Sequence, residues 1–248
     1  MDVIKKTKFY LKIYGLRYYC PFCKTHLRKL LPRGEDNQTI KKYNIIGMGK
    51  RDCYCPVCFS TDKERILYYF LSKKTDVFNK KRKMSLLHFA PEKNFEPLFK
   101  SLKNINYTTA DLYFKNVMLK LDVTDINIDD KAFDVVICNH VLEHVVDDMK
   151  AINEIYRILK PGGWAIIQVP FSNIIEKTYE NIDIKSEKER LKKFGQKDHV
   201  RIYGKDYINR LKSPGFNVKA FDTIKEFGIR KIRKIGAIEG EKIFYCKK

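Results

Sequence analysis

FDVVICNHVLEHVVDDMKAINEIYRILKPGGWAIIQVP, residues 133–170, is the stretch that decides the fold. It opens with a nearly unbroken apolar run, Phe133–Cys138, which is typical of a strand that is buried on both faces of a parallel sheet. Asp147 is the predicted N-cap of a helix, and Lys160–Gly163 ends that helix before a second buried strand at 164–169. The residues that would face the sheet recur at helical spacing: Met149, Ile152, Tyr156 and Leu159. The order strand, helix, strand predicts an open α/β sheet.

Polar residues follow the first of these strands abruptly, at Asn139, His140, Glu143 and His144. In an open α/β sheet the ligand crevice lies just beyond the carboxyl ends of the strands. We therefore expect a functional site at this point of the chain.

Two segments of this stretch, FDVVICNHVLEHV and LKPGGWAIIQVP, together resemble class I S-adenosylmethionine-dependent methyltransferases, in particular the type 11 group. The resemblance covers residues 84–248. A further segment, FGQKDHVRIYG at 194–204, resembles a subgroup of these enzymes that also carries a cysteine-rich N-terminal segment. The resemblance implies a Rossmann-like sandwich with a mostly parallel seven-stranded sheet, and S-adenosylmethionine as the cofactor.

Composition sets wider bounds on the chain. A length of 248 residues with 44% hydrophobic residues favours one large domain, or one domain with a small appendage. The formal net charge of +20 suggests an anionic partner (nucleic acid, a phosphorylated or nucleotide-linked substrate, or a membrane surface) or simply a solvated basic surface. The sequence has no run of 18 apolar residues and no apolar core of a signal peptide, so we expect a cytoplasmic protein without a membrane span.

Two Cys-Pro-x-Cys turns, Cys20–Cys23 and Cys55–Cys58, indicate a metal site, because each turn can supply two thiolates of one tetrahedron. Unmetallated turns and redox dithiols are the alternatives, but a redox motif normally occurs once and after a strand. Cys53 and His26 are less favoured ligands. We predict a structural Zn²⁺ held by Cys20, Cys23, Cys55 and Cys58 in a zinc-ribbon-like segment.

We expect short strands at 26–32 and 43–48 within this segment, and an amphipathic helix within residues 1–19. A helix capped by Thr61 should follow the second turn. The charged stretch Lys73–Lys83 predicts the division into an N-terminal arm and zinc-ribbon-like segment, 1–80, and a Rossmann-like methyltransferase domain, 81–248.

The first strand of that domain, 84–90, leads into a segment, HFAPEKN, where the chain departs from the family pattern. The family has an acidic residue followed by a Gly-x-Gly loop. Here His88 stands near the acidic position, Ala90 still allows close approach of the backbone, and Glu92 is suited to the cationic amino group of the methionine moiety. The alternative is a loop that no longer binds cofactor.

Two aspartates complete the cofactor prediction at the ends of the second and third strands. The resemblance implies that Asp111 accepts hydrogen bonds from the ribose hydroxyls and Asp122 from the adenine amino group, with Asn139 beside them. Only ten residues separate the two aspartates, so a loop replaces the helix that the family has there. Capping of turns is the alternative role for both aspartates.

The chain leaves the sheet after Pro170, and residues 171–193 are predicted to form a helical insertion or lid. We expect His199 to be a general base oriented by Asp198, with His140 and His144 as the next candidates, because a histidine suits proton transfer near neutral pH. A self-satisfied hydrogen-bonded turn is the alternative for this loop. The predicted substrate-binding residues are Gln196, Arg201, which would pair with an anionic group, and Tyr203.

The remaining strands are expected at 216–221 and 243–246, with a basic segment between them. The function predicted from the resemblance is O-methylation of a sugar, glycan precursor or other small, anionic metabolite. One alternative is a zinc-ribbon RNA methyltransferase, although Asn139–Leu142 reads Asn-His-Val-Leu and lacks the Asn-Pro-Pro-aromatic motif of amino-methylating nucleic-acid enzymes. The other alternative function is that of a catalytically silent binding module.

Overall fold

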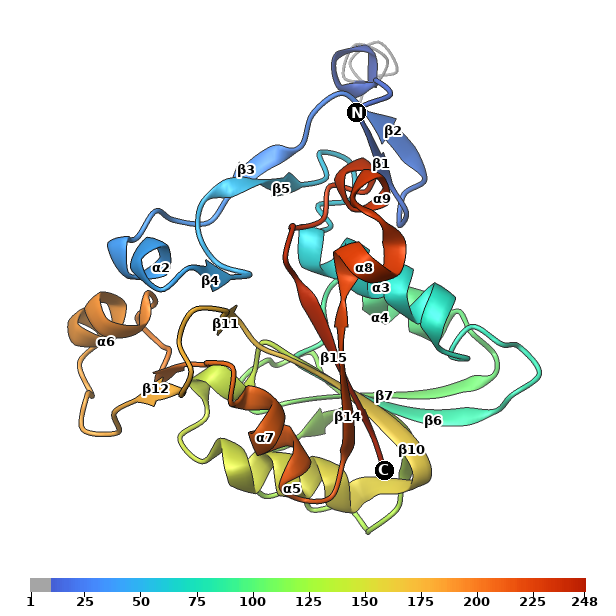
Figure 1. Ribbon diagram of the computed structural model, residues 1–248. Helices are drawn as coiled ribbons and strands as arrows, with labels where there is room; N and C mark the ends of the chain where they lie inside the picture. Colours follow the sequence, from blue (N-terminus) through green and yellow to red (C-terminus); the bar gives the residue numbers. More distant parts are fainter. Residues whose placement is uncertain (1–9) are drawn as a thin grey trace.

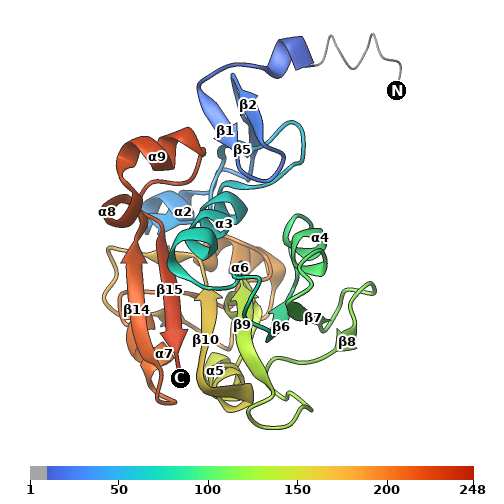
Figure 2. The ribbon, with the colours of Figure 1, turned by 90° about the vertical axis from the view of Figure 1, so that its right-hand side faces the viewer.

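The computed structural model describes residues 10–248, with a seven-stranded sheet at its centre (Figures 1 and 2). The strand order is β14-β15-β10-β9-β6-β7-β8. β15 runs antiparallel to both of its neighbours, and the other neighbouring pairs are parallel. The bounds are β6 (Met84–Phe89), β7 (Ile105–Asp111), β8 (Leu119–Lys120), β9 (Phe133–Asn139), β10 (Leu159–Gln168), β14 (Asn217–Asp222) and β15 (Lys242–Lys247). The Rossmann-like sheet predicted from the sequence is confirmed.

Helices cover both faces of this sheet, and each face has its own hydrophobic core. α5 (Asp148–Ile158) and α7 (Tyr207–Lys212) pack on one face. α3 (Asp62–Lys74), α4 (Phe95–Lys100) and α9 (Ile229–Lys234) pack on the other, where α8 (Thr223–Phe227) precedes α9. Because the central strands are apolar on both sides, they contribute alternate residues to the two cores.

Local sequence signals fix the ends of these helices. Thr61 caps α3 through a reciprocal capping box with Glu64, and Asp147 caps α5 by accepting from the Lys150 N–H. α5 ends at Ile158, before the Pro-Gly-Gly turn. The second strand, however, begins earlier than predicted, since β10 already pairs with β9 at Leu159 and resumes its register at Trp164.

The N-terminal segment differs in detail from the two strands predicted at 26–32 and 43–48. β1 (Tyr18–Cys20) and β2 (Thr25–Leu27) form a hairpin, while β3 (Leu31–Arg33) pairs with β5 (Arg51–Tyr54). A short helix, α2 (Gln38–Lys42), stands between them because Asn37 caps it. β4 (Ile45–Ile46) pairs outside the segment, with β11 (Phe171–Ser172). Residues 10–13 are helical, but residues 14–17 are not and β1 begins at Tyr18, so the predicted N-terminal helix ends early; residues 1–9 lie outside the described residues.

The Arg65 side chain links this segment to the sheet domain. Its guanidinium is fully buried and donates to four backbone carbonyls, those of Cys53, Ser60, Ile235 and Gly236. Because α3 shares the core of one sheet face, the last part of segment 1–80 packs as part of the sandwich. The division at residue 80 stays a prediction.

The insertion after β10 is built together with the N-terminal segment. It contains β11, β12 (Tyr179–Glu180), α6 (Glu187–Phe194) and β13 (Arg201–Ile202), and β12 pairs with β13. α6 lies beside α2 (Figure 1), where Asn37 and Thr39 donate to the carbonyls of Leu191 and Lys192. In the part of the chain that the structure describes, no helix is long and apolar enough to cross a membrane.

Candidate active site

The carboxyl ends of β6 and β9 meet in a cluster of three polar side chains. Asn139 Nδ2 donates to Glu92 Oε1 at 2.9 Å, and His88 Nε2 lies 2.7 Å from Glu92 Oε2. The other nitrogen of His88, Nδ1, lies 3.0 Å from the Tyr107 hydroxyl. Two buried acceptor atoms, Glu92 Oε2 and Asn139 Oδ1, have no aligned hydrogen bond within the described chain. The site therefore offers acceptors to a ligand that donates hydrogen bonds.

The backbone turns sharply at both strand ends. Ala90 and His140 have left-handed conformations, with φ of 47° and 56°. Their N–H groups still extend the ladder, because Ala90 donates to the Ala110 carbonyl and His140 to the Gln168 carbonyl. These turns bring the residues that follow each strand over the edge of the sheet.

Electrostatics keep the carboxylate of this cluster ionised. Burial by itself raises the pKa of Glu92, but the His88 ring and the Asn139 amide outweigh it, so the pKa is lowered. Glu92 is therefore an anion at neutral pH.

A small pocket lies between α3 and the carboxyl ends of β9 and β10. Lys63, from the first turn of α3, reaches into it and places Nζ 3.4 Å from His140 Nδ1. Burial lowers the pKa of Lys63, and no carboxylate of the described chain lies within ion-pair distance of Nζ. The pocket is lined by Lys63, Ile66, Leu67, Glu92, Asn139, His140, Gln168, Glu241 and Ile243.

The two predicted cofactor aspartates lie at the ends of β7 and β8 but are engaged in turns. Asp111 Oδ1 accepts from the N–H groups of Tyr113 and Phe114, and Asp122 Oδ1 accepts from the N–H and hydroxyl of Thr124. The loop predicted in place of a helix is present after Asp111. Both contacts match the turn-capping alternative, and in each contact the second carboxylate oxygen is not used.

The predicted catalytic histidines lie close together on the other side of His140. His140 Nδ1 lies 3.3 Å from Glu143 Oε1. The rings of His144 and His199 are in edge contact, with centroids 4.8 Å apart. Asp198 contacts His144, not His199, because its Oδ2 lies 3.3 Å from His144 Nδ1. The structure thus brings His140, His144 and His199 together around Glu143.

Burial shapes the charges in this group. It lowers the pKa of His199 to about 4, so the ring is neutral at pH 7. Burial also lowers the pKa of His140. For Glu143, burial raises the pKa, but the hydrogen bond and charge of His140 lower it more, to about 2. At neutral pH the group therefore holds one carboxylate, Glu143, beside the neutral ring of His199.

The three predicted substrate residues have different surroundings. Gln196 is exposed. Arg201 is buried and donates to Glu180 and to the carbonyls of the 142–146 loop, and the Tyr203 hydroxyl donates to Asp148 at 2.8 Å. The hydrogen-bond donors that Arg201 and Tyr203 use in these internal contacts are therefore not available to a substrate.

The four predicted metal-binding cysteines converge at the turn of the β1–β2 hairpin. Cys20 Sγ lies 3.5 Å from Cys58 Sγ, and Cys23 Sγ lies 3.6 Å from Cys55 Sγ. All four sulfur atoms lie within 4.8 Å of one another. A tetrahedral Zn²⁺ with bonds of about 2.3 Å places its sulfur ligands about 3.8 Å apart, so the cluster fits that ion. Cys53 lies outside the cluster.

Residues 94–167 match the family described as "Methyltransferase domain". They run from the start of α4 to β10 and include Asp111, Asp122 and Asn139, whereas His88 and Glu92 precede the match. The match covers 74 of the 248 residues, so the chain contains a segment similar to a methyltransferase domain.

Among curated proteins, the chain is similar to the uncharacterized protein MJ1123 of Methanocaldococcus jannaschii, with 38% identity over 119 residues. The alignment covers 47% of this chain and 54% of the relative, so the chain spans about half the length of the relative it matches.

Two of the solved structures to which the chain is similar are methyltransferases. An S-adenosylmethionine-dependent methyltransferase from Mesorhizobium loti has a TM-score of 0.50 and 12% identity, covering 76% of this chain and 99% of that one. The 1,6-didemethyltoxoflavin-N1-methyltransferase of Burkholderia thailandensis was solved with 1,6-didemethyltoxoflavin and S-adenosylhomocysteine. Its TM-score is 0.47 at 12% identity, and the match covers 75% of this chain and 78% of that one.

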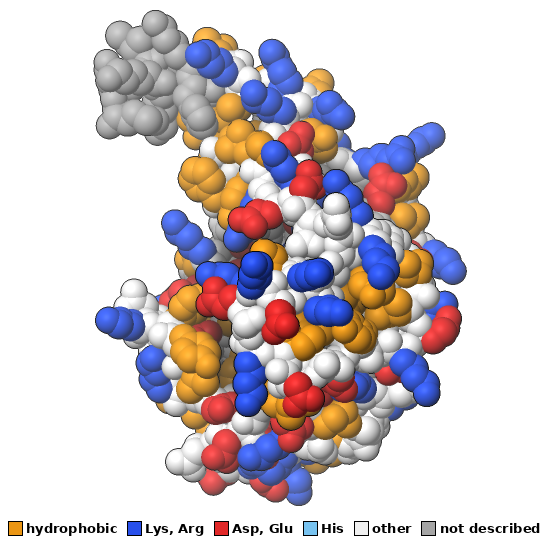
Figure 3. Space-filling view, turned by 90° about the vertical axis from the view of Figure 1, so that its left-hand side faces the viewer, with side chains coloured by type: hydrophobic (Ala, Val, Ile, Leu, Met, Phe, Trp, Pro, Cys, Tyr) orange, Lys and Arg blue, Asp and Glu red, His pale blue; other side chains and the backbone are white. Residues whose placement is uncertain are grey.

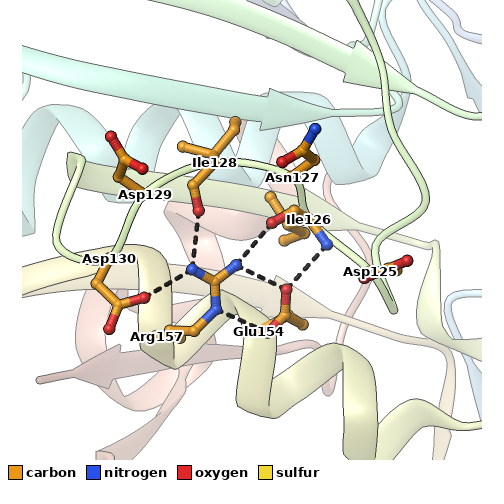
Figure 4. Close-up of a pocket in the computed structure, with 8 residues that line it drawn as sticks. All are labelled: Asp125, Ile126, Asn127, Ile128, Asp129, Asp130, Glu154 and Arg157. Atoms are coloured by element: carbon orange, nitrogen blue, oxygen red, sulfur yellow. Dashed lines mark hydrogen bonds and ion pairs between the residues drawn. The ribbon is translucent and has the colours of Figure 1, made fainter.

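A second, wider pocket lies at the opposite end of the strands, beside the start of β9. Figure 4 shows Arg157 at its centre, donating to Asp130, Glu154 and the carbonyls of Ile126 and Ile128. These contacts fix the loop between β8 and β9. The pocket is remote from the carboxyl ends of the strands, and its only cation, Arg157, is already paired with Glu154 and Asp130.

Sequence reasoning missed two residues of the small pocket, Lys63 and Glu241. Lys63 sits in the first turn of a helix and Glu241 just before the last strand, so no motif marks either of them. Burial raises the pKa of Glu241 to about 7. Glu143 had a signal, because it belongs to the polar run after β9, yet its burial among the histidines is visible only in three dimensions.

Proposed function

We propose that this methyltransferase domain transfers a methyl group to an oxygen atom of a small, anionic acceptor, such as a sugar, a glycan precursor or another small metabolite. The observation that carries the proposal is the polar cluster at the ends of β6 and β9, with Glu92 and Asn139 aimed at a small pocket beneath α3. This pocket lies at the carboxyl ends of the strands, where open α/β sheets bind their ligands.

The residues present fit S-adenosylmethionine. Glu92, ionised and with a buried oxygen that lacks an aligned hydrogen bond, suits the cationic amino group of the methionine moiety. The unused oxygen of Asp111 would accept from the ribose, and that of Asp122 from the adenine amino group. Ala90 keeps the backbone turn narrow, and His88 holds Glu92 in place. When bound, the cofactor supplies a methyl group that is already electrophilic, so the protein must chiefly hold the acceptor in line with it.

Lys63 supports an anionic acceptor better than Arg201 does. The Lys63 amine reaches the pocket without a carboxylate partner, whereas the Arg201 guanidinium is saturated by Glu180 and backbone carbonyls. The role of His199 as general base stays a prediction, as do the roles of Gln196 and Tyr203.

The face shown in Figure 3 gives no support for RNA as the acceptor. On the face shown in Figure 3, Lys and Arg side chains are spread out with Asp and Glu side chains between them, and they do not form one basic tract. A site for an RNA backbone usually gathers such side chains along one face.

We further propose that Cys20, Cys23, Cys55 and Cys58 hold a structural Zn²⁺. The fit of the four sulfur positions to a tetrahedron supports this, as does the small size of the core around the cluster.

Calorimetric titration with S-adenosylhomocysteine tests the cofactor site. Glu92→Gln should weaken binding by about 1.5–3 kcal/mol, roughly 10- to 150-fold in Kd, since it removes a charged acceptor. Glu96→Gln, four residues later in the first turn of α4 and outside the pocket, is the matched control and should bind normally. Equal affinity of both variants would place the amino group elsewhere.

A panel of sugar nucleotides, other anionic metabolites and RNA, incubated with methyl-labelled cofactor, tests the acceptor. Label on a small acceptor supports the proposal. Label on RNA alone, with binding that weakens steeply as salt is raised, would overturn it.

A further inference from the structure

We propose that Glu143, His144 and His199 form a binding site for a divalent transition-metal ion, and that oxygen atoms of the acceptor complete its coordination. The role of the acceptor rests on the proposed function. Binding of the metal ion concerns the chain alone.

The three side chains place their donor atoms close to one another. One donor atom from each, a carboxylate oxygen and two ring nitrogens, lies within 4.8 Å of the other two. Bonds of about 2.0–2.2 Å require donor atoms within about 4.4 Å of one another. Movements of a few tenths of an ångström therefore bring them onto one ion. His144, with 36% of its side chain exposed, has room to make them.

The buried donors also lack partners of their own. Glu143 is 2% exposed, and its Oε2 has no hydrogen bond within the described chain. His199 is 3% exposed, and neither ring nitrogen has a hydrogen bond to another described residue. A buried polar atom without a partner costs about 1–3 kcal/mol. A metal ion bound to Glu143 Oε2 would remove that cost, and the His199 ring would supply a ligand that no other described residue uses.

The surrounding contacts orient the ligands as metal sites require. Asp198 contacts His144 at Nδ1, through its carboxylate and its carbonyl, which leaves Nε2 of that ring for the ion. The Val200 N–H donates to the Glu143 carbonyl, and Arg201 donates to the carbonyls of residues 142, 145 and 146. The buried Arg201 network thus holds the two loops in the register that joins His144 to His199.

The donor set defines the class of ion. Two imidazoles and one carboxylate suit Mn²⁺, Fe²⁺, Co²⁺, Ni²⁺ or Zn²⁺, whereas four thiolates select Zn²⁺ at the cysteine cluster. Three protein ligands leave open positions on the ion. An acceptor with two neighbouring oxygens, such as a vicinal diol or a hydroxycarboxylate, would fill two of them.

The cluster is continuous with the pocket of the proposed acceptor. Glu143 Oε1 lies 3.3 Å from His140 Nδ1, and that atom lies 3.4 Å from Lys63 Nζ. An acceptor chelated at the ion would have Lys63 available for an anionic group. In this arrangement His199 is a ligand and not the general base, so the two roles exclude each other.

Binding of the metal alone tests the site. Full-length protein with its zinc content measured is titrated with Mn²⁺, and the free Mn²⁺ signal is followed by electron paramagnetic resonance. One site per chain is expected. Glu143→Gln and His144→Ala should each weaken it at least 10-fold, and His26→Ala, a histidine outside the cluster, should not. His144 is partly exposed, so His144→Ala should fold even if a buried variant does not.

No Mn²⁺ binding, or binding that both variants leave unchanged, would overturn the site. The acceptor role is tested with the labelled acceptor assay after removal of the ion by a chelator that leaves zinc bound. Activity that is lost and then restored by Mn²⁺ supports that role, and undiminished activity refutes it. S-adenosylhomocysteine affinity, measured on the same samples, shows separately whether the methyltransferase site is intact.

Discussion

Replacing Glu241 by Gln is expected to stabilise the protein above neutral pH and to leave its stability nearly unchanged in acid. Glu241 is 2% exposed at the pocket beneath α3. Its Oε1 has a long hydrogen bond, 3.4 Å, from Gln168 Nε2, and its Oε2 has no partner in the described chain. Burial raises its pKa from 4.5 to about 7, although the charges of Lys63 and Arg51 oppose the rise.

This shift fixes both the sign and the size of the effect. Below pH 4.5 the carboxyl group is protonated in the folded and unfolded chains, and it makes no difference to stability. Between pH 4.5 and 7 only the unfolded chain releases the proton, so the free energy of unfolding falls as pH rises. At about 1.4 kcal/mol per pKa unit, the free energy of unfolding has fallen by about 3 kcal/mol once the pH is above 7. Gln imitates the protonated group and should escape this loss.

Urea unfolding at pH 4.5 and pH 8, followed by circular dichroism, provides the measurement. The wild type should be less stable than Glu241→Gln by about 3 kcal/mol at pH 8, and the difference should vanish at pH 4.5. Glu239→Gln, two residues earlier and half exposed, is the control and should show no such pH dependence. A Glu241→Gln variant that is less stable at pH 8 would mean that the carboxylate is ionised and stabilising in the native state.

Three further outcomes are expected. Protein purified without added metal should contain about one zinc per chain, and Cys55→Ser should lower that content while Cys138→Ser should not, as measured by elemental analysis. Arg65→Met should lower the free energy of unfolding by at least about 3 kcal/mol, because four buried carbonyls lose their donor; a loss below 1 kcal/mol in urea melts would contradict this. Asp111→Asn should keep the turn yet weaken the binding of S-adenosylhomocysteine about 10-fold, as measured by calorimetry. An unchanged affinity would mean that Asp111 is not part of the cofactor site.

The sheet was predictable because its signals are local. The apolar run Phe133–Cys138 is buried on both faces, and Asp147 caps the helix that follows it. The short spacing from Asp111 to Asp122 correctly excluded a helix between β7 and β8. The paired cysteine turns likewise predicted that four sulfur atoms would meet.

Contacts between distant segments were beyond the reach of sequence patterns. Lys63 and Glu241 meet at one pocket across almost 180 residues, and neither belongs to a motif. The hydrogen-bonding capacity of Arg201 suggested a substrate contact, but the number of carbonyls around it is a property of the folded loops. Residue type gives the chemistry that a side chain can perform, and the fold decides whether that capacity is already used.

The cysteine cluster and the pocket are joined by a short chain of contacts, which gives the N-terminal segment a role in the site. The Ser60 hydroxyl lies 3.2 Å from the sulfur atoms of both Cys20 and Cys58, and the Ser60 carbonyl accepts from Arg65. Three residues after Ser60, Lys63 enters the pocket from the capped turn of α3. Zinc held by the cysteines would therefore set where α3 begins and where the Lys63 amine lies. Loss of zinc should disturb the acceptor side of the crevice before it disturbs the cofactor contacts at β6 and β7, because those strands are anchored in the sheet.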